Sequence, residues 1–306
     1  MKILVVGRSG LLASELAHRF HESEHDAVVV GRPVLDIRDP HCIRKALDNT
    51  GPDLVINASA YGGGQTTLDQ AEQETELTFS INRDGVKSLA EACQIRHVPL
   101  IHVSTDYVFD GHGTQPIAES SPVGPLNVYG QSKWEGEEAV RATCERHLII
   151  RTAWLYGREG RNFLRTMLCL GKDKHEIRVV QDQYGCPTWV RNLAQTILVL
   201  CNAVQREQAS IPWGTFHFCG AGHTTWYAFA MAIFQNVAGL DVMTVNTITP
   251  IPTTAYPSTV LRPRYSVLCC EKIRSTFGVN PPRWQDSLTD CLREMYPCHS
   301  LHLGQS

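Results

Sequence analysis

The sequence predicts an α/β fold in which a doubly wound parallel sheet is accompanied by a smaller C-terminal lobe. Short apolar runs alternate with longer amphipathic segments through the first half of the 306-residue chain. The apolar runs keep their polar residues mostly at their ends, which is typical of strands covered on both faces. Repeated strand and helix units with right-handed crossovers build a sheet that carries helices on both sides.

Five apolar runs are the expected strands of this sheet. They alternate with helical stretches, the first of which places Leu12, Leu16 and Phe20 on one face. After about residue 158 the pattern loosens into helical pieces with two short strands, so we expect a first domain at 1–157 and a smaller lobe at 158–306 that is interleaved with it. The five strands are 3–7, 27–31, 53–59, 100–105 and 147–157, and further helical stretches are 69–95 and 132–146.

Composition excludes several classes of function. The chain has 28 Lys+Arg against 31 Asp+Glu and no basic block, so we expect neither a nucleic-acid nor a membrane partner. Its 11 cysteines lack any C-x-x-C spacing and fit free thiols in a reducing compartment. The first apolar run is too short for a signal sequence, and no later run reaches the roughly 18 residues of a membrane span. We expect a cytoplasmic location.

The end of the first strand carries a glycine motif that favours dinucleotide binding over an ordinary turn. In VVGRSGLLA, Gly7 permits a tight turn, Gly10 lets backbone amides approach a pyrophosphate, and Ala13 lets helix and strand pack closely. The N-terminus of the following helix is an anion site. The cofactor contacts expected in this turn are Gly7, Ser9, Gly10, Leu11 and Leu12.

The second strand ends in VVVGRP, where an NAD site usually offers a carboxylate to the ribose. Arg32 would instead meet a 2′-phosphate, because a guanidinium binds phosphate in a bidentate manner. We therefore favour NADPH as the cofactor. NADH stays open, and so does a solvated loop position for Arg32.

HESEH at 21–25 matches the H-E-x-x-H pattern of zinc hydrolases. That pattern binds zinc when both imidazoles lie on one face of a continuous helix and a third ligand is near. Here it falls at the end of the first crossover helix, on the side away from the ligand edge of the sheet. We predict a polar helix end and no metal, and no G-x-S-x-G sequence supports a serine hydrolase.

NVYGQSK at 127–133 places Tyr129 four residues before Lys133, on one helical face. Ser104, Thr105 and Asp106 stand at the end of strand 100–105, the edge where open α/β sheets bind ligands. A hydroxyl beside a Tyr/Lys pair at a dinucleotide crevice is the arrangement of a carbonyl reductase. Moving a phenol pKa from about 10 to about 7 needs roughly 4 kcal/mol. A surface pair supplies a few tenths of a kcal/mol, so the pair is catalytic only in a water-poor crevice beside the cofactor.

Ordered sequence blocks cover residues 7 to about 268, and STDYVFDG and NVYGQSK are the most specific of them. GRSGLLASEL, LDIRDP, DLVINASAY, LDQAE, RTAWLYG, DQYGCPT and RPRYSVL accompany them. With these blocks the chain resembles the extended short-chain dehydrogenase/reductase family, in its dTDP-4-dehydrorhamnose reductase branch. The resemblance implies a Rossmann-type dinucleotide-binding domain at 1–157, a mainly substrate-binding lobe at 158–306, and a nucleotide-sugar substrate.

The resemblance also implies roles for the matching residues. Tyr129 would give a proton to the sugar C4 oxygen, Thr105 would hydrogen-bond that oxygen, and Lys133 would hold the cofactor ribose and lower the tyrosine pKa. Without the resemblance, Trp154 would be interpreted as a core residue. The implied cofactor contacts are Asp36, Ile37, Ala58, Ser59, Ala60, Tyr61, Tyr129 and Lys133, and the implied substrate contacts are Ser104, Thr105, Asp106, Trp154 and Arg262.

Two departures from the branch bear on substrate and assembly. The insertion GGGQ at Gly62–Gln65 separates Tyr61 from Thr66 and leaves the sugar identity open, because glycines there allow a lid or a close backbone approach. Glu15 matches an acid linked to a metal-bridged dimer in some members, but the partner segment WVRN has no acid. We do not predict that metal, and a homodimer stays open.

The leading hypothesis is an NAD(P)H-dependent reductase that converts dTDP-4-dehydrorhamnose to dTDP-rhamnose. One alternative is a reductase of another 4-keto sugar or of a secondary metabolite. Another is a regulatory subunit without catalysis, since the methionine adenosyltransferase β subunit also resembles this branch. The presence of Thr105, Asp106 and Trp154 together with the Tyr/Lys pair favours an enzyme.

Overall fold

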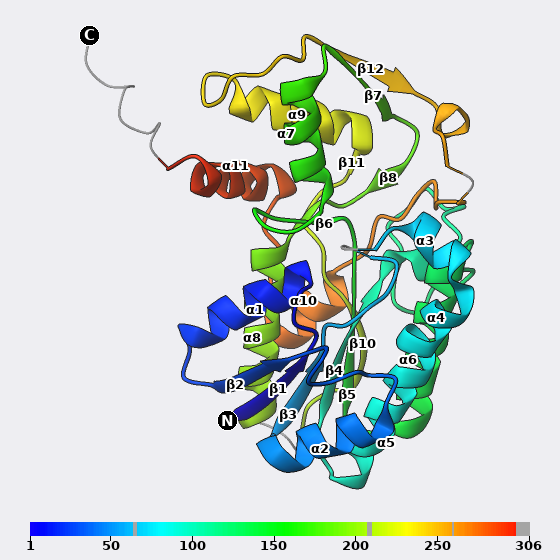
Figure 1. Cartoon of the computed structure of the whole chain (residues 1–306), viewed down its shortest axis with the longest axis vertical. Helices are drawn as coiled ribbons and strands as arrows, with labels where there is room; N and C mark the ends of the chain where they lie inside the picture. Colours follow the sequence, from blue (N-terminus) through cyan, green and yellow to red (C-terminus); the bar gives the residue numbers. More distant parts are fainter. Residues whose placement is uncertain (64–65, 207–209, 259, 298–306) are drawn as a thin grey trace.

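The central sheet is built from six parallel strands. The computed structural model describes residues 1–63, 66–206, 210–258 and 260–297. Its largest sheet has the strand order β10-β5-β4-β3-β1-β2, and all neighbouring strands are parallel. From β1, the chain adds β2 on one side and β3, β4 and β5 on the other, so the strand order reverses between β1 and β3. This topology confirms the doubly wound α/β class predicted from the sequence (Figure 1). The strands are β1 (Lys2–Val6), β2 (Asp26–Val30), β3 (Leu54–Asn57), β4 (Leu100–Thr105), β5 (His147–Thr152) and β10 (Gly214–His217).

Helices cover both faces of this sheet because alternate strand residues point to opposite sides. Ile3 and Val5 of β1 belong to one core cluster, and Leu4 and Val6 belong to the other. Each such fully buried side chain contributes about 1.5–3 kcal/mol relative to exposure. The first face is covered by α1 (Leu11–His21), α8 (Val190–Arg206) and α10 (Glu271–Phe277), and the second by α2 (Pro40–Thr50), α5 (Val86–Ile95) and α6 (Val128–Thr143).

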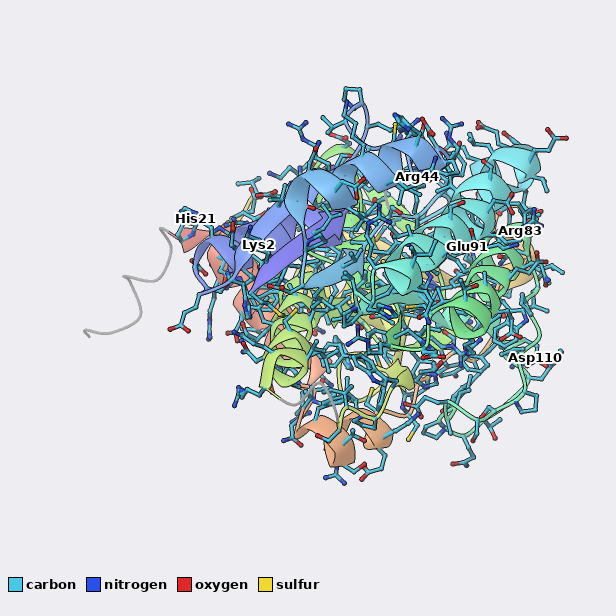
Figure 2. All side chains as sticks on the ribbon, turned by 90° about the horizontal axis from the view of Figure 1, so that it is seen from below. Lys2, His21, Arg44, Arg83, Glu91 and Asp110 are labelled. Atoms are coloured by element: carbon cyan, nitrogen blue, oxygen red, sulfur yellow. The ribbon has the colours of Figure 1, made fainter. Side chains whose placement is uncertain are left out.

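The outer side of the second helical layer is polar. Arg44 of α2 and Glu91 of α5 are exposed, whereas Ile43 and Leu89 on the inner sides of the same helices are fully buried. Figure 2 shows this layer from below, with both labelled residues on its helices. The apolar stripes therefore fix how α2 and α5 lie on the sheet.

The stretch 69–95, expected to be helical, is divided into shorter helices. It contains α3 (Leu68–Gln73), α4 (Thr75–Phe79) and a π-helix (Ser80–Gly85) before α5. Thr67 and Gln70 form a reciprocal capping box that fixes the start of α3. The π-helix bulges the backbone, as such turns often do near functional sites, and it directs Asn82 toward the residues that follow β3.

The second half of the chain contributes to both the lobe and the sheet. The lobe contains α7 (Phe163–Asp173), α9 (Trp226–Val237) and α11 (Trp284–Met295). Helices α8 and α10 and strand β10 instead pack with the sheet, so the chain crosses between the two regions (Figure 1). The domain boundary after residue 157 stays a prediction, and residues 298–306 of the second unit lie outside the described ranges.

Short strand pairs complete the lobe and its junction with the sheet. Three two-stranded pairs form: β7 with β12, β6 with β9, and β8 with β11. Throughout the described ranges, no helix combines the length and apolar character needed to cross a membrane. The six strands of these pairs are β6 (Leu155–Tyr156), β7 (Glu176–Val180), β8 (Tyr184–Gly185), β9 (Thr188–Trp189), β11 (Thr224–Thr225) and β12 (Thr247–Ile251).

Candidate active site

The carboxyl ends of β1, β3, β4 and β5 open into a cavity of about 1240 Å³. Open α/β sheets bind ligands at this edge, near the point where the strand order reverses. All but one of the residues assigned from the sequence to cofactor or substrate line this cavity, and the exception is Arg262. The assigned residues among its lining are Gly7, Ser9, Gly10, Leu11, Leu12, Arg32, Asp36, Ile37, Ala58, Ser59, Ala60, Tyr61, Ser104, Thr105, Asp106, Tyr129, Lys133 and Trp154.

The turn between β1 and α1 fits a ligand that approaches the backbone closely. Gly7 has φ +121°, and an added Cβ would lie 3.0 Å from the carbonyl carbon of Ala58. Its N–H donates to the Val30 carbonyl at 2.7 Å, which ties the turn to β2. Gly10 is the N-cap of α1 and has no side chain to satisfy the first helical N–H groups. These amides and the helix dipole can therefore hold a phosphate.

Two arginines line the cavity where β2 ends. Arg32 was predicted there, and Arg8 joins it because the side chain of Arg8 packs against Gly31. Neither guanidinium forms an ion pair with any residue in the described ranges. Asp36 is instead bound by Arg38, whose Nη2 lies 2.5 Å from Oδ2, and this contact lowers the Asp36 carboxyl pKa. The local charge is therefore suited to a phosphate rather than to a ribose hydroxyl.

The expected catalytic residues Thr105, Tyr129 and Lys133 lie together where β4 ends and α6 begins. Thr105 and Asp106 follow each other at the tip of β4, and the Thr105 hydroxyl donates to Asp106 Oδ1 at 3.1 Å. Asn127 caps α6 by accepting from the Gly130 N–H at 2.8 Å. That cap starts the helix so that Tyr129 and Lys133 both face the cavity.

Gly130 explains why a glycine separates this tyrosine from its lysine. A Cβ at Gly130 would collide with the carbonyl oxygen of Tyr107, in the turn that follows β4. The absence of a side chain thus lets α6 lie directly on that turn. The ring of Tyr129 packs edge-on against the ring of Tyr107, with centroids 5.8 Å apart. The helix start is therefore fixed relative to Thr105.

Burial is the largest influence on the pKa values of Tyr129, Lys133 and Asp106. It raises the pKa of Tyr129 to about 12, although a hydrogen bond with Thr105 opposes the rise. Burial lowers the pKa of Lys133 to about 8, and the charge of Glu137 opposes that change. Burial also raises the pKa of Asp106 to about 6. The protein groups alone therefore favour a protonated phenol rather than the lowered tyrosine pKa expected from Lys133, because the cost of desolvating a phenolate is larger.

The glycine-rich segment after β3 lies directly against Tyr129. A Cβ atom added at Gly62 would lie 2.7 Å from Tyr129 Cδ2, and one added at Gly63 would lie 2.9 Å from the Tyr129 hydroxyl oxygen. Asn82 holds this segment, because its side chain bonds both the N–H and the carbonyl of Tyr61 at 2.8 Å. The close backbone approach expected of the insertion therefore occurs at its first two residues. Gly64 and Gln65 lie outside the described residues.

An aromatic wall faces the sheet from the lobe. Trp154 stacks on Trp226 with ring centroids 3.4 Å apart, and Phe163 packs against Trp226 at 4.6 Å. All three side chains line the cavity. Trp154 has φ +46°, a strained conformation for a residue with a large side chain, and such strain is often found at functional sites. Sequence reasoning missed Trp226, which lies far from Trp154 along the chain, and Phe163, which follows Trp154 by nine residues.

Arg262 lies beside the cavity rather than in its lining. Its guanidinium is 5.2 Å from the centroid of the Tyr256 ring, and Tyr256 itself lines the cavity. Its Nη2 lies 3.8 Å from Asp69 Oδ2. The predicted contact of Arg262 with a substrate therefore stays a prediction, and the structure places its guanidinium over the Tyr256 ring.

Two buried hydroxyls at the strand ends lack partners among the described residues. They are Ser104 Oγ at the end of β4 and Thr152 Oγ1 at the end of β5, and both residues line the cavity. A buried hydroxyl without a hydrogen bond costs about 1–3 kcal/mol. Both oxygens are therefore placed to bond a polar ligand.

The H-E-x-x-H pattern is not carried by one helix. Helix α1 ends at His21, and His25 lies beyond it with Nε2 3.0 Å from Asn202 Oδ1. Glu15 is bound by Arg19 at 3.0 Å and also faces Arg191 at 3.5 Å. Two cations thus already surround the carboxylate that matches a metal-linked position in the branch. Within the described part of the chain, no cluster of three His, Cys, Asp or Glu side chains is arranged to hold a metal.

Comparison with known proteins identifies a family and several similar chains. A model of the RmlD substrate binding domain family matches residues 1–296. A dTDP-4-dehydrorhamnose reductase from Burkholderia thailandensis is 38% identical over 300 residues, which are 96% of this chain and 99% of that protein. A dTDP-4-keto-6-deoxy-D-glucose reductase from Streptomyces niveus is 38% identical over 288 residues, which are 94% of each.

A solved structure extends the likeness to three dimensions. The dTDP-4-dehydrorhamnose reductase of Bacillus anthracis, in complex with NADP, superimposes with a TM-score of 0.87 at 32% sequence identity. The likeness covers 96% of this chain and 99% of that chain. It thus spans both the sheet and the lobe.

Proposed function

Because this chain belongs to the RmlD substrate binding domain family, we propose that it is an NADPH-dependent reductase of dTDP-4-dehydrorhamnose that forms dTDP-rhamnose. The observation that carries the proposal is the meeting of Thr105, Tyr129 and Lys133 in the cavity that also holds the β1 glycine turn. Those two groups of residues are the parts that a carbonyl reductase needs: a proton donor and a dinucleotide site.

The cofactor side fits NADPH. Gly7 and Gly10 leave room for a pyrophosphate at the N-terminus of α1, and Arg8 and Arg32 supply positive charge for a 2′-phosphate. The complex of the related Bacillus anthracis reductase with NADP supports this choice. When bound, the reduced nicotinamide supplies the hydride that C4 of the sugar receives.

The protein residues handle the proton. Tyr129, held as a phenol by burial, gives its proton to the C4 oxygen as negative charge develops there. Thr105 turns its hydroxyl hydrogen from Asp106 Oδ1 to the same oxygen, and the Lys133 ammonium lowers the energy of the phenolate that remains. Gly62 and Gly63 exclude water from one side of the Tyr129 ring.

The substrate side combines apolar and polar surfaces. The stack of Trp154 on Trp226 offers a flat wall for the deoxysugar, whose methyl carbon is apolar. Ser104 and Asp106 provide hydrogen-bonding groups at the end of β4, and Tyr256 with the Arg262 guanidinium over its ring lies on the nucleotide side. The ten free cysteines of the described chain support the expected cytoplasmic location.

A second candidate is reduction of a related 4-keto sugar, because the Streptomyces niveus relative is a dTDP-4-keto-6-deoxy-D-glucose reductase with the same 38% identity. The test mixes purified protein with NADPH and, one at a time, dTDP-, GDP- and UDP-linked 4-keto sugars, and follows the absorbance of the reduced nicotinamide. We expect consumption with dTDP-4-dehydrorhamnose above all others. Preference for another sugar supports the second candidate, and cofactor binding without any consumption supports a regulatory subunit.

A further inference from the structure

His102 is a fully buried histidine directly beneath the proposed catalytic lysine. It lies in β4, three residues before Thr105, and its side chain has no exposed surface. Both of its ring nitrogens are within hydrogen-bond distance of a partner. Nδ1 lies 3.1 Å from Asn57 Nδ2, and Nε2 lies 3.4 Å from Lys133 Nζ. The roles proposed above for Lys133 do not involve this ring.

The neighbours of Asn57 fix the orientation of its amide. Asn57 Oδ1 accepts from the Ser59 N–H at 3.0 Å and from the Ser59 hydroxyl at 2.6 Å. The backbone N–H can only donate, so Oδ1 must point toward Ser59. The other amide atom, Nδ2, therefore faces His102 and offers it a hydrogen.

This orientation determines the tautomer of His102. Because Asn57 donates to Nδ1, that nitrogen must present its lone pair, and the single proton of the neutral ring lies on Nε2. A doubly protonated ring is disfavoured as well, since burial and the charge of Lys133 hold the pKa of His102 well below its usual value. The Nε2–H group thus points at Lys133.

Facing that N–H, the two forms of Lys133 behave differently. An ammonium has only donors, so it cannot accept from Nε2–H, whereas a neutral amine has a lone pair that can. In both forms Lys133 Nζ can still donate to the Val103 carbonyl, which lies at 2.7 Å. We propose that His102 is a positioning residue that presents its Nε2–H to Lys133 and favours the neutral amine, so that this lysine releases its proton readily.

The other charged groups near Lys133 compensate this effect only in part. Glu137, on the same helix, is completely buried and already binds Arg151 of β5 at 2.6 Å and Arg141 at 2.5 Å. Its attraction for the Lys133 ammonium is therefore shared with two guanidinium groups.

Two further titratable groups, Tyr129 and Asp106, line the same cavity as Lys133. Burial raises the pKa of the Tyr129 phenol to about 12, so that group stays neutral while Lys133 titrates. Burial raises the pKa of Asp106 only to about 6, so its carboxylate is charged in that range. The lowered pKa of Lys133, about 8, agrees with a site that tolerates the neutral amine.

The consequence for turnover rests on the proposed reductase function. After Tyr129 has given its proton to the sugar, the phenolate must regain one. The Lys133 ammonium can supply that proton through water in the cavity, which leaves Tyr129 as a phenol and Lys133 as an amine held by the His102 N–H. The amine then binds a proton from a hydronium ion or a buffer acid of the solvent, which restores the starting state.

The first test examines the unliganded protein and does not depend on its activity. The chain has 13 histidines, whose tautomers can be read from long-range ¹H–¹⁵N spectra of histidine-labelled protein. We expect His102, assigned with His102→Gln, to carry its proton on Nε2. A proton on Nδ1 would overturn the proposal, because Nε2 would then accept from the ammonium and stabilise it.

The second test measures Lys133 itself. The chain has only seven lysines, so their ε-carbons can be followed by ¹³C spectroscopy as the pH is raised. We expect Lys133 to titrate near 8 in the native protein and about one unit or more higher in His102→Leu. His102→Gln, whose amide can accept from Asn57 and donate to Lys133, should restore the low value.

A matched control and a second variant separate this effect from damage to the fold. His147 is a buried histidine of the neighbouring strand β5 whose Nδ1 contacts the Cys144 carbonyl, and His147→Leu should leave the Lys133 titration unchanged. Asn57→Leu keeps His102 but frees its tautomer, and it should raise the Lys133 pKa in the same direction. An unchanged or lower Lys133 pKa in both His102→Leu and Asn57→Leu would refute the proposal. Failure of the reductase assay would leave these results intact.

Discussion

At the scale of single residues, the site depends on one position without a side chain. Gly130 lets α6 rest on the Tyr107 carbonyl, and this contact sets the distance between Tyr129 and Thr105. The cap from Asn127 fixes where the helix starts but not how closely it lies on the turn. The geometry of the proposed proton donor thus follows from backbone packing as much as from its own side chain.

Gly130→Ala should therefore impair both stability and activity. The added methyl must displace either α6 or the turn after β4, and overpacking of this kind typically costs about 1–3 kcal/mol. We expect a lower free energy of unfolding by that amount and a kcat reduced by at least about tenfold, measured by urea unfolding and NADPH consumption. Gly113→Ala is the control, because a Cβ there meets only Gln115 O, at 3.9 Å. Equal behaviour of the two variants would contradict the packing argument.

Lys133 should lower the free energy of unfolding of the native protein at neutral pH. Its pKa falls from 10.5 to about 8 on folding, so below about pH 8 the folded state carries a buried ammonium. The unfolded chain binds more protons between these two values, so this penalty disappears as the pH rises through that window. Lys133→Met should be more stable than the native protein at pH 7, by on the order of 3 kcal/mol.

Thermal unfolding of both proteins from pH 7 to pH 10 provides the measurement for Lys133→Met. The stability gap should shrink steadily as the pH rises from about 8. A gap that stays constant with pH, or a variant less stable at pH 7, would show that the ammonium is well compensated in the folded state.

The two arginines near β2 should set the choice between cofactors. Arg8→Ala and Arg32→Ala each remove a guanidinium that lines the cavity. Charge-assisted contacts to a phosphate are worth about 1.5–3 kcal/mol, so NADPH should bind roughly 10- to 100-fold more weakly while NADH binding changes little. Dissociation constants from nicotinamide fluorescence give both values, with the exposed Arg44→Ala as a control. Equal losses for the two dinucleotides would remove the argument for a 2′-phosphate site.

At the scale of elements, the aromatic wall joins the end of β5 to the start of α9. Trp154 follows β5 in a strained conformation, and the stack with Trp226 holds it there. The strand predicted over 147–157 is accordingly interrupted at this point and resumes as β6. The interruption turns the Trp154 ring toward the lobe rather than along the sheet.

Trp226→Ala should weaken substrate binding without changing cofactor binding. Loss of the stacked ring removes a flat apolar wall on the lobe side and leaves the turn at Gly7 intact. We expect KM for the dTDP-sugar to rise about tenfold or more while the NADPH dissociation constant stays within twofold. Tyr227→Ala, at the next position of α9, is the matched control. A rise confined to the NADPH constant would place the stack on the cofactor side.

The strand-end residues could be predicted because their signals are local. Gly7, Thr105 and Tyr129 each sit in a short motif whose place at a strand end or helix start is visible in the sequence. The rule that parallel strands end at one edge then brings them together.

The missed residues depend on tertiary packing. Arg8 enters the cavity because it packs on Gly31, Trp226 arrives with a helix of the lobe, and Asn82 is turned inward by the π-helix. The protein groups alone raise the pKa of Tyr129, because the depth of burial is a property of the folded cavity. The lowering of this pKa beside a bound nicotinamide stays a prediction.

At the scale of the whole molecule, the cavity belongs to both regions of the chain. The sheet supplies the glycine turn and the Tyr/Lys pair, and the lobe supplies Trp226 and Tyr256. The chain returns from the lobe to the sheet through α8, β10 and α10, so the two regions are connected more than once. A reductase built in this way can bind its cofactor on one region and its sugar on the other.

The most direct test of this account is the rate of NADPH-dependent reduction of dTDP-4-dehydrorhamnose by Tyr129→Phe. Phenylalanine keeps the ring that packs on Tyr107 and removes only the hydroxyl. We expect kcat to fall by about 10²- to 10⁴-fold, as for loss of a general acid, while NADPH binds with unchanged affinity. A variant that retains kcat within a few fold of the native protein would contradict the assignment of Tyr129 as the proton donor.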